Sequence, residues 1–201
     1  MAMILASQSP RRRELLGQMG FSFTVRPAKG EELPHPELTP AQLVEELARQ
    51  KALEVSVEAA SDDVVVAADT VVAIDGVVLG KPRDKAHAAE MLSALSGREH
   101  TVYTGVAVKR GETLLVEHEA TQVRFRPLTE REIDLYIQTG EPMDKAGSYG
   151  IQGYGALLVE GIRGDYFNVV GLPICRLGRM LAQVGEDALA QCAQKCAEKE
   201  R

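Results

Sequence analysis

Three consecutive arginines, Arg11 to Arg13, stand at the predicted start of a helix, in the stretch LASQSPRRREL. Ser9 and Pro10 are typical of an N-cap and a first helical position, and the helix is expected to end near Gly20. A helix N-terminus exposes unpaired N–H groups and about half a positive charge, so it favours Asp and Glu over Arg. The three cations therefore indicate that a negatively charged group, missing from the sequence, belongs here.

Helical periodicity predicts that Arg12 points inward, because it lies almost in line with the apolar stripe of this helix. The stripe consists of Leu15, Leu16 and Met19. A buried charge without a partner is costly, and N–H donors combined with guanidinium groups form a phosphate site. A solvated basic turn, or an ion pair of Arg12 with Glu31 or Glu32, is an equal alternative, since no glycine-rich nucleotide fingerprint is present.

A single carboxylate, Asp69, interrupts the apolar stretch VVVAADTVVAI. Only a cation, a metal ion or a polar cleft would keep it ionised within such a stretch. Asp69 is therefore a candidate acid–base or metal-binding group. The alternative is an aspartate at the edge of a strand that faces water.

Other charged residues near these motifs extend the same chemistry. Lys51 lies on the predicted helix before the Asp69 strand, and Lys81 ends the hairpin after it. Glu31 and Glu32 form an acidic pair in a predicted loop. Each of these residues alone suits a solvated surface. Together they supply hard oxygen ligands for Mg²⁺ or Mn²⁺ and cations for phosphoryl oxygens, which favours metal-assisted chemistry on phosphate.

The composition is that of one globular domain or two closely packed lobes, with 201 residues, 45% hydrophobic and 26% charged. A net charge of −6 and the absence of Trp argue against a general nucleic-acid binder. No apolar run approaches the ~20 residues of a membrane span, and the short run at 3–6 does not suit a signal peptide. We expect a cytoplasmic protein with no nucleic-acid or membrane partner.

The histidines and cysteines show no metal-binding pattern. The 4 histidines are scattered without ligand spacing, so a zinc site is not expected. Cys175, Cys192 and Cys196 are an odd, sparse set that gives neither a disulfide framework nor a metal site. We expect Cys192 and Cys196, one turn apart in a predicted helix, to be exposed reduced thiols.

The elements that must position these residues alternate between strands and helices. A short buried strand is predicted at 3–6, and the turns Asp75–Gly76 and Arg110–Gly111 predict two hairpins. A further strand is predicted at 156–162. The remaining predicted elements are helices at 10–20, 40–57, 85–95, 130–139 and 172–183, and a loosely attached polar helix within 186–201.

Between two of these elements lies a glycine-rich stretch, GEPMDKAGSYGIQGYG, which covers 140–155. It is long for a connection and carries several polar groups. Long loops of this kind are often functional. Gln152 within it carries both an amide donor and an acceptor, although a turn residue that bonds its own loop would look the same in the sequence.

In this order, the motifs resemble the Maf family of nucleoside triphosphate pyrophosphatases. They are ASQSPRRRELL, the Glu31–Glu32 pair, AADTVV, GKP, LSG, TGV, and GEPMDKAGSYGIQGYG followed by VVGLP. The resemblance extends from the N-terminus to about Met180. It implies an α/β fold with an elongated mixed β-sheet, flanking helices and two lobes around a central cleft, similar to inosine triphosphatase. It also implies one domain over 1–185, a polar tail over 186–201, and a homodimer.

The family resemblance implies hydrolysis of a nucleoside triphosphate to the monophosphate and pyrophosphate. The positions that match functional positions of the family are Ser7, Arg11, Arg12, Glu32, Lys51, Asp69, Lys81 and Gln152, and Thr70 joins them as a substrate-binding residue. Asp69 is then the proton acceptor. The loop DKAGSYGIQG is similar to the branch that acts on dTTP and UTP. One departure is Gln8, where many relatives have Gly.

On this interpretation Glu32 and Asp69 hold a divalent cation (Mg²⁺, Mn²⁺ or Co²⁺), and the missing anion is the triphosphate of the substrate. Cations at Arg11, Arg12, Lys51 and Lys81 offset the charge that develops on the leaving pyrophosphate. Gln152 can pair with N3–H and a carbonyl of uracil or thymine. The implied role is the removal of non-standard pyrimidine nucleotides. The alternatives are a nucleotide-binding regulator of septum formation and cell division, or a pyrophosphatase of the 7-methyl-GTP type.

Overall fold

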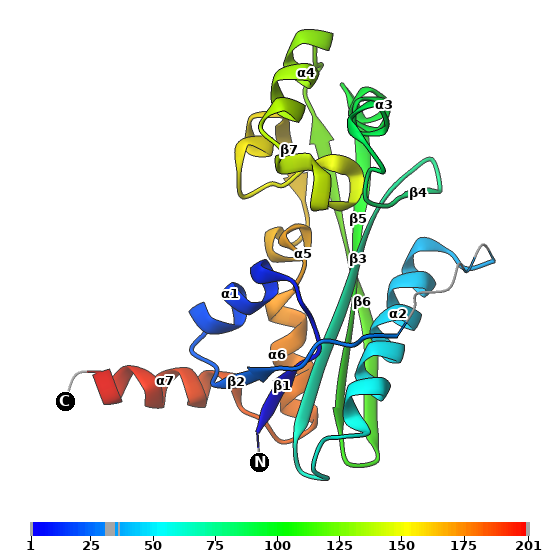
Figure 1. Cartoon of the computed structure of the whole chain (residues 1–201). Coiled ribbons are helices and arrows are strands. Elements are labelled where there is room, and N and C mark those ends of the chain that lie inside the picture. The colour runs from blue at the N-terminus through cyan, green and yellow to red at the C-terminus, as the bar shows by residue number, and fades with distance from the viewer. Residues whose placement is uncertain (1, 31–34, 36, 200–201) are drawn as a thin grey trace.

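The computed structural model describes residues 2–30, 35 and 37–199, and Figure 1 shows how their elements are arranged. The strands are β1 (Met3–Leu5), β2 (Phe23–Val25), β3 (Val64–Ile74), β4 (Val77–Leu79), β5 (Glu99–Arg110), β6 (Thr113–Phe125) and β7 (Val159–Arg163). In this part of the chain they form one seven-stranded sheet in the order β2–β1–β3–β5–β6–β7, with β4 also paired to β3. β1 is parallel to β2 and β3, and the other pairs are antiparallel.

Helices cover both faces of the sheet, so the predicted α/β class with a mixed sheet is confirmed (Figure 1). They are α1 (Pro10–Gln18), α2 (Pro40–Ser56), α3 (Lys85–Leu95), α4 (Glu130–Gln138), α5 (Tyr166–Val170), α6 (Ile174–Gln183) and α7 (Ala188–Lys199). Short 3₁₀ turns are η1 (Glu141–Asp144), η2 (Ala146–Ser148) and η3 (Tyr154–Leu157). None of the helices described is both long and apolar enough to pass through a lipid bilayer.

Side chains alternate along β3, so one strand contributes to cores on both faces of the sheet. On one face Val66 packs in a cluster with residues of α1 and α6, and Val72 packs in another with residues of α3 and α4. Thr70 lies between these two apolar clusters on the same face. On the opposite face Val65 and Ala67 pack against α2. One face of β3 therefore packs against α1, α6, α3 and α4, and the opposite face packs against α2.

Gly105 of β5 allows α2 to pack directly against the sheet. A Cβ atom at Gly105 would lie 2.1 Å from the carbonyl oxygen of Val44 and 2.7 Å from the backbone nitrogen of Glu45. Both atoms belong to the backbone of α2, which cannot move without shifting the helix. Gly105 is the register partner of Asp69, so this close approach holds α2 and its Lys51 over that aspartate.

Several predicted elements are confirmed in position and type. The hairpin turn at Asp75–Gly76 joins β3 to β4, and the helix predicted at 85–95 is α3. Thr39 and Thr129 cap α2 and α4, each in a capping box with the residue three positions later. Ser9 occupies the N-cap position of α1 as predicted, but its hydroxyl makes no capping hydrogen bond.

Other boundaries were predicted wrongly. The strand expected at 156–162 begins only at Val159, because the preceding residues form η3. The helix expected at 172–183 begins at Ile174, and the short helix α5 precedes it. Gly171, with a φ of 120°, ends α5, and Pro173 begins α6 as its N-cap. β2 and α5 have three and five residues, too few for a periodicity to show in the sequence.

The C-terminal helix α7 is attached to the end of α1 rather than hanging loose. Lys195 donates a hydrogen bond from Nζ to the carbonyl oxygen of Gly20 at 2.9 Å, and the Cys192 thiol donates to that of Met19. Cys192 is therefore half-buried, which corrects the expectation of an exposed thiol. Cys196 is exposed as expected, and all three cysteines are free thiols.

We expect Gly105→Ala to lower the free energy of unfolding by about 2–3 kcal/mol, because the added methyl group overlaps the backbone of α2. Urea denaturation would measure the change. Gly161→Ala on β7 is the matched control, since a Cβ atom there meets no atom within 4 Å. Equal midpoints for the two variants would show that α2 does not depend on this close approach.

Candidate active site

A cavity of about 1010 Å³ lies between the N-terminal segment, the middle of β3 and the stretch 141–153. Its volume is at the upper end of the range for small-molecule sites. It is lined by all the described residues that the sequence predicts as functional: Ser7, Arg11, Arg12, Lys51, Asp69, Thr70, Lys81 and Gln152. The remaining predicted residue, Glu32, lies outside the described residues, as does Glu31.

The cavity reaches β3 where that strand has a neighbour on one side. β1 pairs with β3 up to Val66, and β4 pairs with it from Val72 onward. Within the described residues, the stretch 67–71 has β5 alone as its strand partner. Asp69 and Thr70 are the polar residues of this stretch, which explains why both line the cavity.

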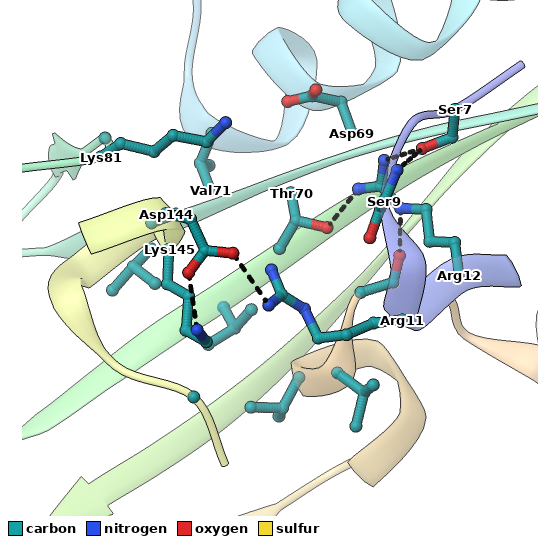
Figure 2. Close-up of a pocket in the computed structure, with 18 of the residues that line it drawn as sticks. Ser7, Ser9, Arg11, Arg12, Asp69, Thr70, Val71, Lys81, Asp144 and Lys145 are labelled. Carbon is teal, nitrogen blue, oxygen red and sulfur yellow. Dashed lines mark hydrogen bonds and ion pairs between the residues drawn. The ribbon is translucent and has the colours of Figure 1, made fainter. Parts of the chain in front are cut away.

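The guanidinium of Arg12 is buried at the wall of this cavity, with 9% of the residue exposed, so the predicted inward orientation is confirmed. It donates from Nε to the carbonyl oxygen of Gly171 at 2.8 Å and from one terminal nitrogen to that of Ala68 at 2.7 Å. It also donates to the hydroxyls of Ser7 and Thr70 at 3.2 and 2.9 Å (Figure 2). These neutral oxygens tie α1 to β3 and to the turn between α5 and α6.

A layer of buried polar groups continues from Thr70 across the sheet. Its hydroxyl is 2.9 Å from that of Thr104, which donates to the carbonyl oxygen of Asn168 at 3.1 Å. The amide of Asn168 donates to the hydroxyl of Thr121 at 2.9 Å. Thr104, Thr121 and Asn168 are fully buried. This layer separates the two apolar clusters on that face of the sheet.

Asp69 points to the other face of β3 and pairs with Lys51 of α2 at an Nζ–Oδ1 distance of 2.5 Å. The two side chains are only 14% and 20% exposed. Asp69 therefore has a cation as its partner and also lines the cavity, two of the environments that the sequence analysis named. Lys81 is exposed at the end of the β4 hairpin, and Figure 2 shows it extending along the cavity toward Asp69.

Arg11 faces a carboxylate that the sequence analysis did not single out. Its guanidinium lies 3.6 Å from Oδ2 of Asp144, and Lys145 Nζ lies 2.6 Å from Oδ1 of the same residue (Figure 2). Burial opposes ionisation of Asp144, but Lys145 and Arg11 outweigh it and lower the pKa of this carboxyl. An acidic residue inside a glycine-rich functional loop was the signal that could have found it.

Gln152 is exposed at the rim of the cavity, in the turn between Gly150 and Gly153. Within the described residues its side-chain amide has no hydrogen-bond partner. The alternative of a turn residue that bonds its own loop is therefore not what this structure contains. A ligand in the cavity can reach both the donor and the acceptor of this amide.

The donor set fits a hard divalent cation only in part. Among the described residues no group of three or more His, Cys, Asp and Glu side chains could hold a metal ion. Asp69 presents a carboxylate to the cavity, and Lys51 contacts its Oδ1 atom. Mg²⁺ commonly binds one or two carboxylates together with substrate phosphates and waters. The carboxylate of Asp69 therefore offers one hard oxygen ligand of the kind that such a cation binds.

Comparisons with known proteins show what this chain is similar to. The family described as "Maf-like protein" matches residues 2–184. A dTTP/UTP pyrophosphatase of Symbiobacterium thermophilum is 55% identical over 184 residues, which cover 91% of this chain and 94% of the relative. One of Moorella thermoacetica is 54% identical over 188 residues, covering 92% and 96%. A solved nucleoside-triphosphatase / dITP/XTP pyrophosphatase from Mycobacterium abscessus has a TM-score of 0.45 at 18% identity, covering 92% of this chain and 97% of that chain.

We expect Arg12→Lys to lower the free energy of unfolding by about 3 kcal/mol, because an ammonium cannot satisfy oxygens arranged around a planar guanidinium. Arg13→Lys should leave stability unchanged, since Arg13 is exposed on the same helix. Urea denaturation of both variants would test this. A similar loss in both would mean that the buried contacts of Arg12 contribute little.

Proposed function

Since the chain belongs to the Maf family, we propose that it hydrolyses dTTP and UTP to the nucleoside monophosphate and pyrophosphate. The observation that carries this proposal is the cavity that the Lys51–Asp69 pair, Arg11, Lys81 and Gln152 share. Relatives more than 50% identical over at least 91% of this chain carry the name dTTP/UTP pyrophosphatase, which supports the choice of substrate.

In this proposal Asp69 is the proton acceptor. The ion pair with Lys51 fixes the position of the carboxylate, which takes a proton from a water molecule that attacks the α-phosphorus. The water oxygen forms a bond to that phosphorus, and the bond to the oxygen bridging the α- and β-phosphates breaks. The electron pair leaves with pyrophosphate, and the proton stays on Asp69.

Cations around the cavity bind the triphosphate. Arg11 and Lys81 line it from opposite elements, α1 and the end of the β4 hairpin. They offset the negative charge that develops on the leaving pyrophosphate. Arg12, Ser7 and Thr70 form the adjoining wall, and the hydrogen bonds among them hold that wall in place.

Turnover also requires a divalent cation, Mg²⁺, Mn²⁺ or Co²⁺, in this proposal. Asp69 and Glu32 would hold it, with phosphate oxygens and waters as the other ligands. When bound, such a cation neutralises charge on the phosphate oxygens. Pyrophosphate release should therefore stop on chelation and return when the metal is added back.

Gln152 selects the base. Its amide can accept from N3–H of uracil or thymine and donate to a neighbouring carbonyl, a pattern that cytosine lacks. The difference between uracil and thymine is one methyl group, which a pocket distinguishes only modestly. This supports joint activity on UTP and dTTP.

Two finer features belong to the same proposal. We infer two lobes around the cavity, because separate apolar clusters lie on either side of the buried polar layer. The family resemblance is the support for a homodimer and for a cytoplasmic location. A regulator of septum formation would bind nucleotide without turnover, and a 7-methyl-GTP enzyme would prefer another base. Any pyrophosphate release argues against the regulator, and a comparison of release from UTP, dTTP and 7-methyl-GTP separates the other enzyme type from the proposed activity.

We expect Asp69→Asn to lower kcat for UTP by about 10²–10⁴-fold, because the amide keeps the shape of the side chain but accepts no proton. Affinity for UTP should change little. Asp134→Asn is the control, since Asp134 is exposed on α4. Pyrophosphate release within a few fold of the wild type would contradict the role of Asp69.

The wild-type protein should hydrolyse UTP and dTTP about 10- to 100-fold faster than CTP or GTP, since a wrong base leaves a polar group unsatisfied. Gln152→Leu should erode the preference for UTP over CTP more than it lowers metal-dependent turnover. Gln138→Leu, on the exposed end of α4, is the matched control. A wild-type preference for 7-methyl-GTP or CTP would overturn the proposed function.

A further inference from the structure

The carboxylate of Glu141 is the centre of a hydrogen-bond cluster beside the cavity. Oε1 accepts from the Tyr136 hydroxyl at 2.8 Å and from the backbone nitrogen of Gly155 at 3.0 Å. Oε2 accepts from the backbone nitrogen of Tyr154 at 2.8 Å. Burial opposes ionisation of Glu141, but the N–H groups of Gly155 and Tyr154 and the Tyr136 hydroxyl lower its pKa overall. A charged acceptor therefore holds one end of the stretch 150–155.

Two glycines give this carboxylate the space it occupies. A Cβ atom at Gly153 would lie 2.1 Å from Oε2 of Glu141, and one at Gly155 would lie 2.8 Å from the Tyr136 hydroxyl. The same hydroxyl accepts from the backbone nitrogen of Gly150 at 3.1 Å. The stretch 150–155 is thus wrapped around the two side chains and held at both ends.

The other end of this arrangement is fixed in the protein core. Tyr136 belongs to α4 and is buried in the apolar cluster around Val72 and Phe125. Lys145 donates from Nζ to the carbonyl oxygen of Glu141 at 2.6 Å, which fixes the backbone of η1 as well. The position of the loop is therefore set relative to the sheet that carries Asp69.

Gln152 lies within this loop and depends on it for its position. Its side chain is exposed and has no hydrogen-bond partner in the described part of the chain, so nothing but the backbone fixes where the amide lies. On either side of Gln152 the backbone is held by a hydrogen bond. The N–H group of Gly150 donates to the Tyr136 hydroxyl, and that of Tyr154 donates to the Glu141 carboxylate. A base that pairs with Gln152 therefore meets a loop whose backbone is already held in place, so less loop entropy is lost on binding.

We propose that Glu141 is a positioning residue that sets base selectivity by holding the Gln152 loop against the core, an inference that rests on the proposed function. Glu141 lines the cavity, but three donors already occupy its two oxygens, so it acts through Gln152 and not on the phosphates. Loss of the carboxylate should loosen the recognition of uracil and leave the chemistry at Asp69 intact.

The test compares Glu141→Gln with Glu130→Gln, which removes the same charge at an exposed position of α4. An amide in place of the Glu141 carboxylate turns an N–H group toward the loop donors. KM for UTP should rise about tenfold, the effect of one lost hydrogen bond to a charged group, while kcat stays within twofold. The UTP-over-CTP ratio of kcat/KM should fall about tenfold, and Glu130→Gln should match the wild type.

Gly153→Ala provides an independent perturbation if Glu141→Gln does not fold. Its methyl group would displace the carboxylate of an intact Glu141, and the same rise in KM is expected. The double variant should show no more than the larger single effect, because both changes break one contact. Additive effects, an unchanged UTP-over-CTP ratio in the folded single variant, or a fall in kcat alone would each overturn the inference.

Binding of a non-hydrolysable α,β-methylene analogue of UTP, measured by calorimetry, separates this inference from the proposed function. If the wild type hydrolyses UTP but Glu141→Gln keeps its base preference, the inference fails and the function stands. If the wild type prefers the uridine analogue to the cytidine analogue, Glu141→Gln loses that preference, and the wild type releases no pyrophosphate from UTP, the function fails and the inference stands. Binding of neither analogue would overturn both.

Discussion

A guanidinium buried in a protein must find oxygen atoms for its N–H groups, and the structure around the cavity is organised by this requirement at Arg12. Two of the oxygens are backbone carbonyls, from β3 and from the turn after α5. Two are hydroxyls, and one of them, Thr70, opens a chain of buried polar contacts to Thr104 and Asn168. Because these contacts join α1 to β3, to Ser7 and to the turn after α5, the wall of the cavity is fixed by polar geometry and not by apolar packing alone.

The second constraint is the alternation of side chains along β3. Thr70 and Asp69 are neighbours in sequence, yet they face opposite sides of the sheet and meet different helices. Thr70 joins the polar layer below α1 and α5, whereas Asp69 meets Lys51 of α2. Both remain open to the same cavity, because in the described residues β1 and β4 leave this part of the strand uncovered on one side. The gap between β1 and β4 along β3 thus gives one cavity access to both the hydroxyl of Thr70 and the carboxylate of Asp69.

The sequence predicts well whatever is local. The inward orientation of Arg12 followed from a periodicity over eight residues, and the N-cap at Ser9 and the hairpin turn at Asp75–Gly76 followed from pairs of neighbouring residues. The partners of Arg12 could not be predicted, since Ala68 and Gly171 lie 56 and 159 positions away and contribute backbone oxygens that every residue possesses. The same holds for Glu141, whose partners are mainly backbone N–H groups. The family resemblance marked which residues gather in one place, but it carried no information on what holds them there.

The ion pair between Arg11 and Asp144 has a consequence for how an anion binds in the cavity. Arg11 already has a carboxylate 3.6 Å away, and Lys145 shares that carboxylate. In the proposed function, an incoming phosphate therefore exchanges with the Asp144 carboxylate at Arg11 and does not fill an empty positive site. The free energy gained is the difference between two ion pairs, so weak anions such as chloride or a monophosphate gain little. Only a ligand with several negative charges competes well with Asp144 for Arg11. The protein's own carboxylate therefore makes binding selective for highly charged anions.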